Sequence, residues 1–200
     1  MKKAAFIIIL ILLIDQISKI YIKTHFVLSE EIKVFGLDWF RIHFLENNGM
    51  AWGKEFGGRS GKLFLSVFRL VAIVGIGYWL YGAIKSNSHK ILIVAISFIF
   101  AGALGNIIDS IFYGIFFDHS FRQVATFLPP EGGYDSLFHG KVVDMLYFPI
   151  WKGDLPNWIP YFGGKSFTFF NAIFNVADTA ISTGVGLLIV FNKKVFPKDF

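Results

Sequence analysis

Four long apolar segments divide the chain, and stretches richer in polar residues separate them. They cover residues 4–22, 63–84, 91–113 and 171–191. Each is about 20 residues long, so as a helix rising about 1.5 Å per residue it crosses the roughly 30 Å hydrocarbon core of a bilayer. The pattern predicts an all-α membrane protein with four transmembrane helices, and we expect residues 1–200 to form a single membrane-embedded domain.

Two longer segments, residues 23–62 and 114–170, connect the predicted helices. Within residues 39–45 of the first, polar and apolar side chains alternate, which is typical of a strand at the boundary between water and an apolar surface. The second contains the sequence Pro129-Pro130-Glu131-Gly132-Gly133, which predicts a loop. We therefore expect the two segments to form a small β-containing platform at one end of the helices.

Lysine residues with almost no neighbouring acids gather in three short flanks of the apolar segments, whereas the basic residues of the two long connecting segments are mixed with most of the acidic residues. The flanking lysines are Lys2 and Lys3 before the first, Lys85 and Lys90 between the second and third, and Lys193, Lys194 and Lys198 after the fourth. Acidic residues are nearly absent from these flanks. The positive-inside rule therefore predicts that both termini are cytoplasmic and that the two long connecting segments face outward.

The composition narrows the class of protein further. Hydrophobic residues make up 54% of the chain and charged residues only 16%, with a mean hydropathy of +0.58, which is too apolar for an ordinary soluble domain. The chain has no cysteine, which excludes disulfides, thiolate nucleophiles and cysteine-ligated metals. The net charge of +5 does not predict a nucleic-acid partner, because the basic residues form no aromatic-interleaved patch.

The fourth apolar segment carries a stripe of polar residues. Asn171, Asn175, Asp178 and Ser182 are spaced i, i+4, i+7 and i+11, which puts them on one face of a helix. Asp178 is seven residues from the start of the segment, so we expect it at a depth of about 10 Å. A carboxylate inside a membrane helix is costly, which makes it a candidate functional residue.

Each of the other apolar segments also carries polar side chains on one face. They are Asp15, Ser18 and Lys19 in the first, Lys62, Ser66 and Arg69 in the second, and Asn106 and Asp109 in the third. With the predicted topology, the ionisable groups of all four helices lie in the outer half of the membrane. We expect them to converge on one polar site just below the outer surface.

Asp144, in the outer segment before the fourth helix, can reach this site and pair with Asp178. Two neighbouring carboxylates can share one proton and activate a water molecule. The alternative for any single residue is a role in helix packing, and for Asp15, Arg69 and Asn106 a structural or positioning role is favoured. Two other classes of function also stay open: a proton-coupled carrier and a non-catalytic membrane scaffold.

Five short motifs follow one another along the chain. They are Asp15-Gln16-Ile17-Ser18-Lys19, Asn47-Asn48-Gly49-Met50-Ala51-Trp52, the segment from Gly102 to Asp109, Val142-Val143-Asp144, and the segment from Phe174 to Ile181. In this order they resemble the motifs of the lipoprotein signal peptidases, also called signal peptidase II, a family of bacterial intramembrane aspartyl proteases. The resemblance extends over most of the chain.

The resemblance implies a role for each matching residue. Asp144 and Asp178 would be the catalytic pair, Asn106, Asp109 and Asn175 would order the site, Asn47 and Gly49 would help to build the outer platform, and Asp15 and Lys19 would support the site from the first helix. The implied substrate is a lipid-modified prolipoprotein, cut before its diacylglyceryl cysteine. No metal or cofactor is implied, and we expect a monomer in contact with membrane lipid, in the bacterial cytoplasmic (inner) membrane.

The sequence departs from the family pattern at two places. Asp109 is followed by Ser110, where the family usually has arginine, and Arg69 and Arg122 are both possible replacements. Asp109 and Asp144 are 35 positions apart, which is more than the family leads us to expect. Asp135, within this longer loop, therefore stays open as an alternative to Asp144.

Overall fold

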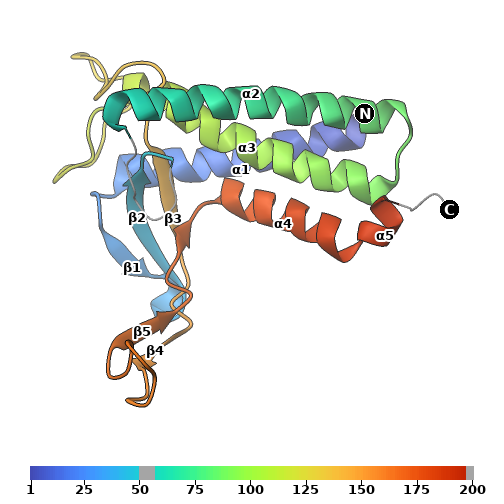
Figure 1. The fold of residues 1–200 in the computed structure, drawn as a ribbon. Coiled ribbons are helices and arrows are strands. Elements are labelled where there is room, and N and C mark those ends of the chain that lie inside the picture. Colours follow the sequence, from blue (N-terminus) through green and yellow to red (C-terminus); the bar gives the residue numbers. More distant parts are fainter. Residues whose placement is uncertain (50–56, 197–200) are drawn as a thin grey trace.

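Long helices run side by side and a small β-sheet lies across one of their ends (Figure 1). The structure is a computed structural model and describes residues 1–49 and 57–196. Its helices are α1 Lys2–His25, α2 Gly58–Lys85, α3 Lys90–Phe116, α4 Val176–Val190 and the short α5 Asn192–Val195. The N-terminus and α5 lie at the end of the bundle opposite to the sheet.

The first three predicted membrane helices correspond to α1, α2 and α3, each a few residues longer than its apolar segment. These three helices are long and apolar enough to cross a membrane. Helix α4 is apolar but has only 15 residues, about 22 Å at 1.5 Å per residue. The described part of the chain is thus that of a mostly helical membrane protein, with three helices of full spanning length and some β-sheet.

The predicted start of the fourth helix was wrong. Helix α4 begins at Val176 rather than at residue 171, because Ile173–Phe174 form strand β6 and Asn175 is the N-cap. Asp178 consequently lies in the first turn of α4 instead of seven residues inside it. Asn171 lies outside the helix, where its side-chain oxygen accepts a hydrogen bond from the hydroxyl of Tyr147 (3.0 Å).

The sheet has four antiparallel strands in the order β1-β2-β3-β6. They are β1 Glu31–Lys33, β2 Arg41–Asn47, β3 Val142–Tyr147 and β6 Ile173–Phe174, with a 3-10 turn, η1 Val34–Gly36, after β1. Strand β2 confirms the strand predicted from the alternation in residues 39–45. A separate hairpin, formed by β4 Trp151–Asp154 and β5 Ser166–Phe169, extends from this sheet.

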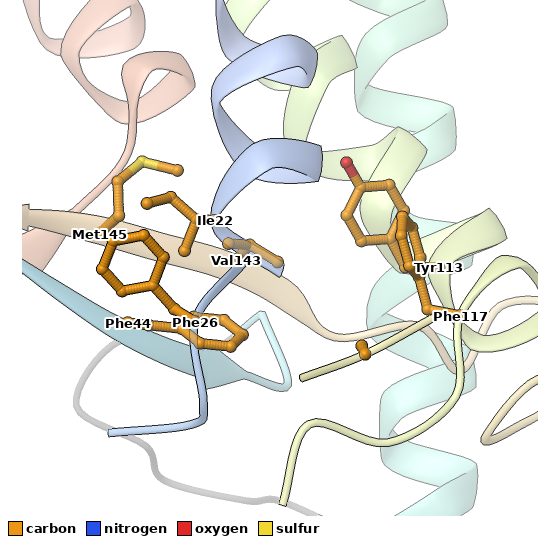
Figure 2. Close-up of a cluster of buried hydrophobic side chains, with 8 residues drawn as sticks. Ile22, Phe26, Phe44, Tyr113, Phe117, Val143 and Met145 are labelled. Atoms are coloured by element: carbon orange, nitrogen blue, oxygen red, sulfur yellow. The ribbon is translucent and has the colours of Figure 1, made fainter. Parts of the chain in front are cut away.

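An apolar cluster joins the sheet to the ends of α1 and α3 (Figure 2). Ile22 and Phe26 come from the end of α1, and Tyr113 and Phe117 from the end of α3. Strands β2 and β3 contribute Phe44, Val143 and Met145, and Ala125 comes from the loop after α3. This cluster fixes β3, the strand that carries Asp144, to the helix ends.

Helix α3 is the central helix and packs against α1, α2 and α4. Two glycines allow the closest approaches. A Cβ atom on Gly102 would lie 2.2 Å from the carbonyl oxygen of Ala177 in α4, and one on Gly105 would lie 2.6 Å from a carboxylate oxygen of Asp15 in α1. The small-residue run in the third helix therefore brings the start of α4 and the polar face of α1 against α3.

Candidate active site

Asp144 and Asp178 come together where β3 meets the start of α4. Strand β6 pairs with β3 through Leu146 opposite Phe174 and through Tyr147 opposite Ile173. Asn175 follows β6 immediately and caps α4. The chain thus leaves the sheet beside Asp144 and enters the first turn of α4, which carries Asp178.

Asn175 contacts both carboxylates and is fully buried. Its side-chain amide donates to an oxygen of Asp144 (2.8 Å). Its backbone N–H donates to Asp178 (3.3 Å), and its side-chain oxygen accepts from the backbone N–H of Asp178 (2.9 Å). The last two bonds form a capping box, which holds Asp178 in a fixed position at the helix N-terminus. Asn175 therefore sets the position of one carboxylate relative to the other.

Asn106 in α3 supplies the second side-chain amide to Asp178. Its Nδ2 donates to Asp178 (2.7 Å), while its Oδ1 accepts from the side chains of Lys19 (2.8 Å) and Asn175 (3.1 Å). Lys19 has only donors, so the oxygen of the Asn106 amide must face it and the NH₂ group must face Asp178. The orientation of this amide is thus determined by the buried lysine behind it.

Lys19 is the centre of a buried ionic network below the two aspartates. Its ammonium lies 3.0 Å from Asp15 and 2.8 Å from Asp109, and all three side chains are buried. Gln16 donates to both carboxylates at 3.0 Å. The three donors of the ammonium are therefore used by Asp15, Asp109 and Asn106, which is the arrangement that a buried charge requires.

The two carboxylates of this network also bind the backbone next to Asp144 and next to Asp178. Asp109 accepts from the backbone N–H of Val143, next to Asp144 (3.3 Å). Asp15 accepts from the backbone N–H of Ala177, next to Asp178 (2.8 Å). A carboxylate at a helix N-terminus is also favoured by the helix dipole. Residues predicted to support the site from the first and third helices thus contact the backbone at both aspartates.

Asn47, Gly49 and Arg69 form the outer edge of the site. The side-chain amide of Asn47 donates to Asp144, and its oxygen accepts from the backbone N–H of Gly49 (2.6 Å). Arg69 donates to the carbonyl of Gly49 and is within electrostatic range of Asp178. Gly49 has a φ of +85°, and a Cβ there would lie 2.5 Å from the Arg69 guanidinium, so glycine is required. Met50, Ala51 and Trp52 of the same motif lie outside the described residues.

The structure separates the alternatives that the sequence left open. Asp135 forms an ion pair with Arg59 (3.0 Å) on the outer loop, away from Asp178. Arg122 is exposed and its guanidinium lies over the ring of Phe121, so Arg69 is the arginine at the site. Ser110, at the position where arginine was expected, is buried and donates to the carbonyl of Asn106 (3.0 Å). Ser182 is exposed on α4.

The sequence pattern did not predict a second buried polar cluster, which surrounds Lys23. Lys23, one turn after Lys19, pairs with Glu46 and donates to Ser120 (2.9 Å), and its ammonium lies over the rings of Phe117 and Tyr134. All three polar side chains are buried. The spacing of Asp15, Lys19 and Lys23 at i, i+4 and i+8 was the available signal. Because Glu46 precedes Asn47 in β2, the cluster ties the outer loop and α1 to the strand that contacts Asp144.

Asp144 is buried, with 7% of the residue exposed. Burial raises its pKa from 3.8 to about 7, and the negative charge of Asp178 adds to the rise. Hydrogen bonds from Asn47 and Asn175, together with the charge of Lys19, act in the opposite direction. The site therefore places a carboxyl that can hold a proton near neutral pH beside a second, half-buried carboxylate. Such a pair can act as an acid and a base in one reaction.

Comparisons with known proteins agree on one family. Residues 7–193 match the family described as Signal peptidase (SPase) II. The lipoprotein signal peptidase of Porphyromonas gingivalis is 47% identical over 190 residues, covering 94% of this chain and 82% of the relative. That of Amoebophilus asiaticus is 36% identical over 187 residues, covering 92% and 75%.

A solved structure of a bacterial membrane enzyme has a similar fold. It aligns with a TM-score of 0.63 and 26% sequence identity, covering 100% of this chain and 93% of that protein. The family match spans α2, α3, α4, both aspartates and the described strands, together with all but the first residues of α1. The chain therefore belongs to the signal peptidase II family, the lipoprotein signal peptidases.

Proposed function

We propose that this protein is an aspartic endopeptidase that removes signal peptides from lipid-modified prolipoproteins, cutting before the diacylglyceryl cysteine. One observation carries the aspartic mechanism: Asn175 holds the side chain of Asp144 and the side chain of Asp178 at the same point of the fold. Family membership supports the substrate class, because the relatives are named lipoprotein signal peptidases. The three helices long and apolar enough to cross a membrane support an intramembrane site.

In the proposed reaction the two carboxylates share one proton. Asp178, ionised, takes a proton from a bound water, whose oxygen attacks the carbonyl carbon of the scissile peptide bond. Asp144, whose raised pKa lets it hold the shared proton, donates a hydrogen bond to the carbonyl oxygen as negative charge develops there. The proton then passes to the leaving amine as the C–N bond breaks. No covalent intermediate is formed.

The other site residues take no part in the proton transfers and instead hold the two aspartates in place. Asn106 and Asn175 orient the carboxylates, and Asp15, Lys19 and Asp109 hold the backbone on which they lie. Asn47, Gly49 and Arg69 form the edge facing the substrate. Asn47, Asn106 and Asn175 provide hydrogen bonds that match ionised or partly ionised carboxylates, which keeps the pair near its working geometry.

The proposed orientation follows from the charges at the two ends of the bundle. Lysines lie near the N-terminus, at the end of α2, at the start of α3 and in α5, all at the end opposite to the sheet. By the positive-inside rule this end faces the cytoplasm, and the sheet and the aspartates lie near the outer leaflet. In this arrangement α4 and α5 complete a fourth, shorter span. We propose a monomer in the bacterial inner membrane, with lipid around α1 and α2.

The proposed function predicts selective cleavage by the purified protein. We expect it to cut a lipidated prolipoprotein in vesicles and to leave the same precursor without its diacylglyceryl group intact. Mass spectrometry of the products should place the cut immediately before the modified cysteine. Intact lipidated precursor after prolonged incubation would overturn the proposal, and proton flux across the same vesicles would favour a carrier.

The raised pKa of Asp144 predicts how activity depends on pH. The shared proton is lost as the pH rises through about 7, so the cleavage rate should fall on the alkaline side of that value.

The stability of the folded protein should also fall as the pH rises. The folded state binds this proton more tightly than the unfolded state, whose pKa is near 3.8, so stability falls between about pH 4 and 7. Rate–pH profiles measure the effect on cleavage, and melting temperatures measured across the same pH range give the effect on stability. In Asp144→Asn the fall in melting temperature across this window should be smaller, and an unchanged fall would contradict the assignment.

A further inference from the structure

The hairpin β4–β5 lies between the two aspartates in sequence but away from the helices in space. It leaves the sheet after β3 and returns to it at β6 (Figure 1). Its strands pair with Trp151 opposite Phe169 and with Asp154 opposite Ser166. It belongs to neither the catalytic pair nor the buried ionic network, and the proposed reaction does not use it.

The register gives this hairpin one apolar and one polar face. Trp151 and Phe169 are paired, as are Gly153 and Phe167, and alternation along the strands places all four on one face. The large side chains of this face are Trp151, Phe167 and Phe169, which are 51%, 42% and 53% exposed. A Cβ atom on Gly153 would lie 2.5 Å from the Trp151 indole, so the glycine leaves space for that ring.

The polar face lies toward the rest of the platform. It carries Lys152, Asp154, Ser166 and Thr168 by the same alternation. Lys152 and Thr168 line a groove of about 510 Å³ together with Glu31, Asp38 and Arg41 of the first outer segment, and Trp151 also borders it. The polar side chains thus have polar neighbours in this groove, whereas Phe167 and Phe169 of the aromatic face do not line it and remain about half exposed.

The tip of the hairpin extends the aromatic surface. Trp158, Tyr161 and Phe162, in the loop between β4 and β5, are 80%, 92% and 58% exposed. An isolated two-stranded hairpin is at best marginally stable in water, and a contiguous exposed apolar patch usually marks a contact surface. The hairpin is therefore expected to contact a surface that can bury tryptophan and tyrosine rings and also bind a neighbouring lysine.

We propose that the β4–β5 hairpin binds the outer leaflet of the membrane, with its aromatic face and tip inserted among the phospholipid headgroups. Tryptophan and tyrosine favour this layer because their rings are apolar and their N–H and O–H groups remain hydrated. The ammonium of Lys165 lies 5.4 Å from the centre of the Phe162 ring, so a cation that can pair with lipid phosphate lies beside the aromatic tip. The inference rests on the membrane orientation given with the proposed function.

The direction of the hairpin supports a lipid surface over other partners. Helices α1, α2 and α3 run roughly parallel, and the hairpin extends across their direction at the end where the sheet lies (Figure 1). If the helices cross the membrane, the hairpin lies along the membrane plane at the level of the outer surface. The ladder between β3 and β6 closes its base, so lipid binding would fix the depth of the aspartates relative to the headgroups.

Fluorescence quenching of Trp158 tests the proposal in the full-length protein. Trp39, Trp52, Trp79 and Trp151 are replaced by phenylalanine, and the single-tryptophan protein is placed in phosphatidylcholine and phosphatidylglycerol vesicles. We expect stronger quenching by lipids with a nitroxide near the headgroup than by lipids with one near the chain end, and weak quenching by aqueous iodide. Efficient iodide quenching without lipid quenching would overturn the proposal, as would shielding that appears only at high protein density, which indicates a second copy.

Charged substitutions provide the second arm. Tyr161→Glu with Phe162→Glu should abolish the quenching by headgroup-labelled lipid, whereas Leu128→Glu, at a 61% exposed position on the other outer loop, should not. Equal melting temperatures in detergent verify that all variants fold. Prolipoprotein cleavage in the same vesicles separates the two proposals. If the protein cleaves the substrate but Trp158 is quenched only by iodide, the hairpin contact alone is refuted. If Trp158 is quenched by lipid but no cleavage occurs, the proposed function alone is refuted.

Discussion

Replacing Asp178 by asparagine is expected to slow the cleavage of a lipidated prolipoprotein by about 10²- to 10⁴-fold, the usual contribution of a general base. The substitution keeps the size of the side chain. The amide oxygen of asparagine can still accept from the backbone N–H of Asn175, so the capping box is kept, whereas the hydrogen bond from Asn106 to the second carboxylate oxygen is lost. What disappears is the group that takes a proton from water. Initial rates with purified protein in vesicles measure the effect.

A matched substitution separates loss of chemistry from loss of structure. Asp135→Asn makes the same change on the outer loop, where the carboxylate pairs with Arg59, and it should leave the cleavage rate within a factor of about two. Asp144→Asn should behave like Asp178→Asn. A rate close to that of the unmodified protein for either Asp144→Asn or Asp178→Asn would show that the residue is not part of the catalytic pair.

The second large effect concerns stability. Lys19→Met should destabilise the protein by about 3–5 kcal/mol, the typical cost of breaking a buried ion pair. The methionine fits the space of the aliphatic chain but leaves Asp15 and Asp109 buried without their cation, and it removes a donor from Asn106. Thermal unfolding in detergent, followed by circular dichroism, should show a markedly lower melting temperature.

Two further variants test the cause of this loss. Lys85→Met removes an exposed lysine at the end of α2 and should change the melting temperature little. Asp109→Asn combined with Lys19→Met should cost less than the sum of the two single substitutions, because the second removes a charge that the first leaves unpaired. Additive losses would mean that Lys19 and Asp109 do not stabilise each other.

Local sequence patterns were sufficient to predict the contacts that helical periodicity controls. Asp15 and Lys19 are four residues apart on one helix face, and they form an ion pair in the structure. Asn106 and Asp109 share a face of α3, and both contact Lys19. Three of the four predicted membrane helices depend on nothing more than apolar length. In these cases each residue follows from neighbours within one or two turns.

The start of α4 could not be predicted in this way, because it depends on residues distant in sequence. Asn171 and Asn175 fit the same helical stripe as Asp178, so periodicity extends the helix to residue 171. Pairing of β6 with β3, and the bond from Ala177 to Asp15, instead end the extended segment at Asn175. Lys23 and Glu46 were missed for a related reason: the lysine lies on the predicted face, but its partner is in a strand that only the fold brings near.

Strand pairing at the base of the β4–β5 hairpin has a consequence for how such sequences diverge. The two residue pairs between β3 and β6 hold the ends of the intervening chain together, so residues can be inserted or lost in the hairpin without moving either aspartate. The three-residue step from Asn175 to Asp178 has no such freedom, since the capping box defines it. In a search for distant relatives, the gap between the two aspartate motifs should therefore be left open in length, and the asparagine–aspartate spacing should be held constant.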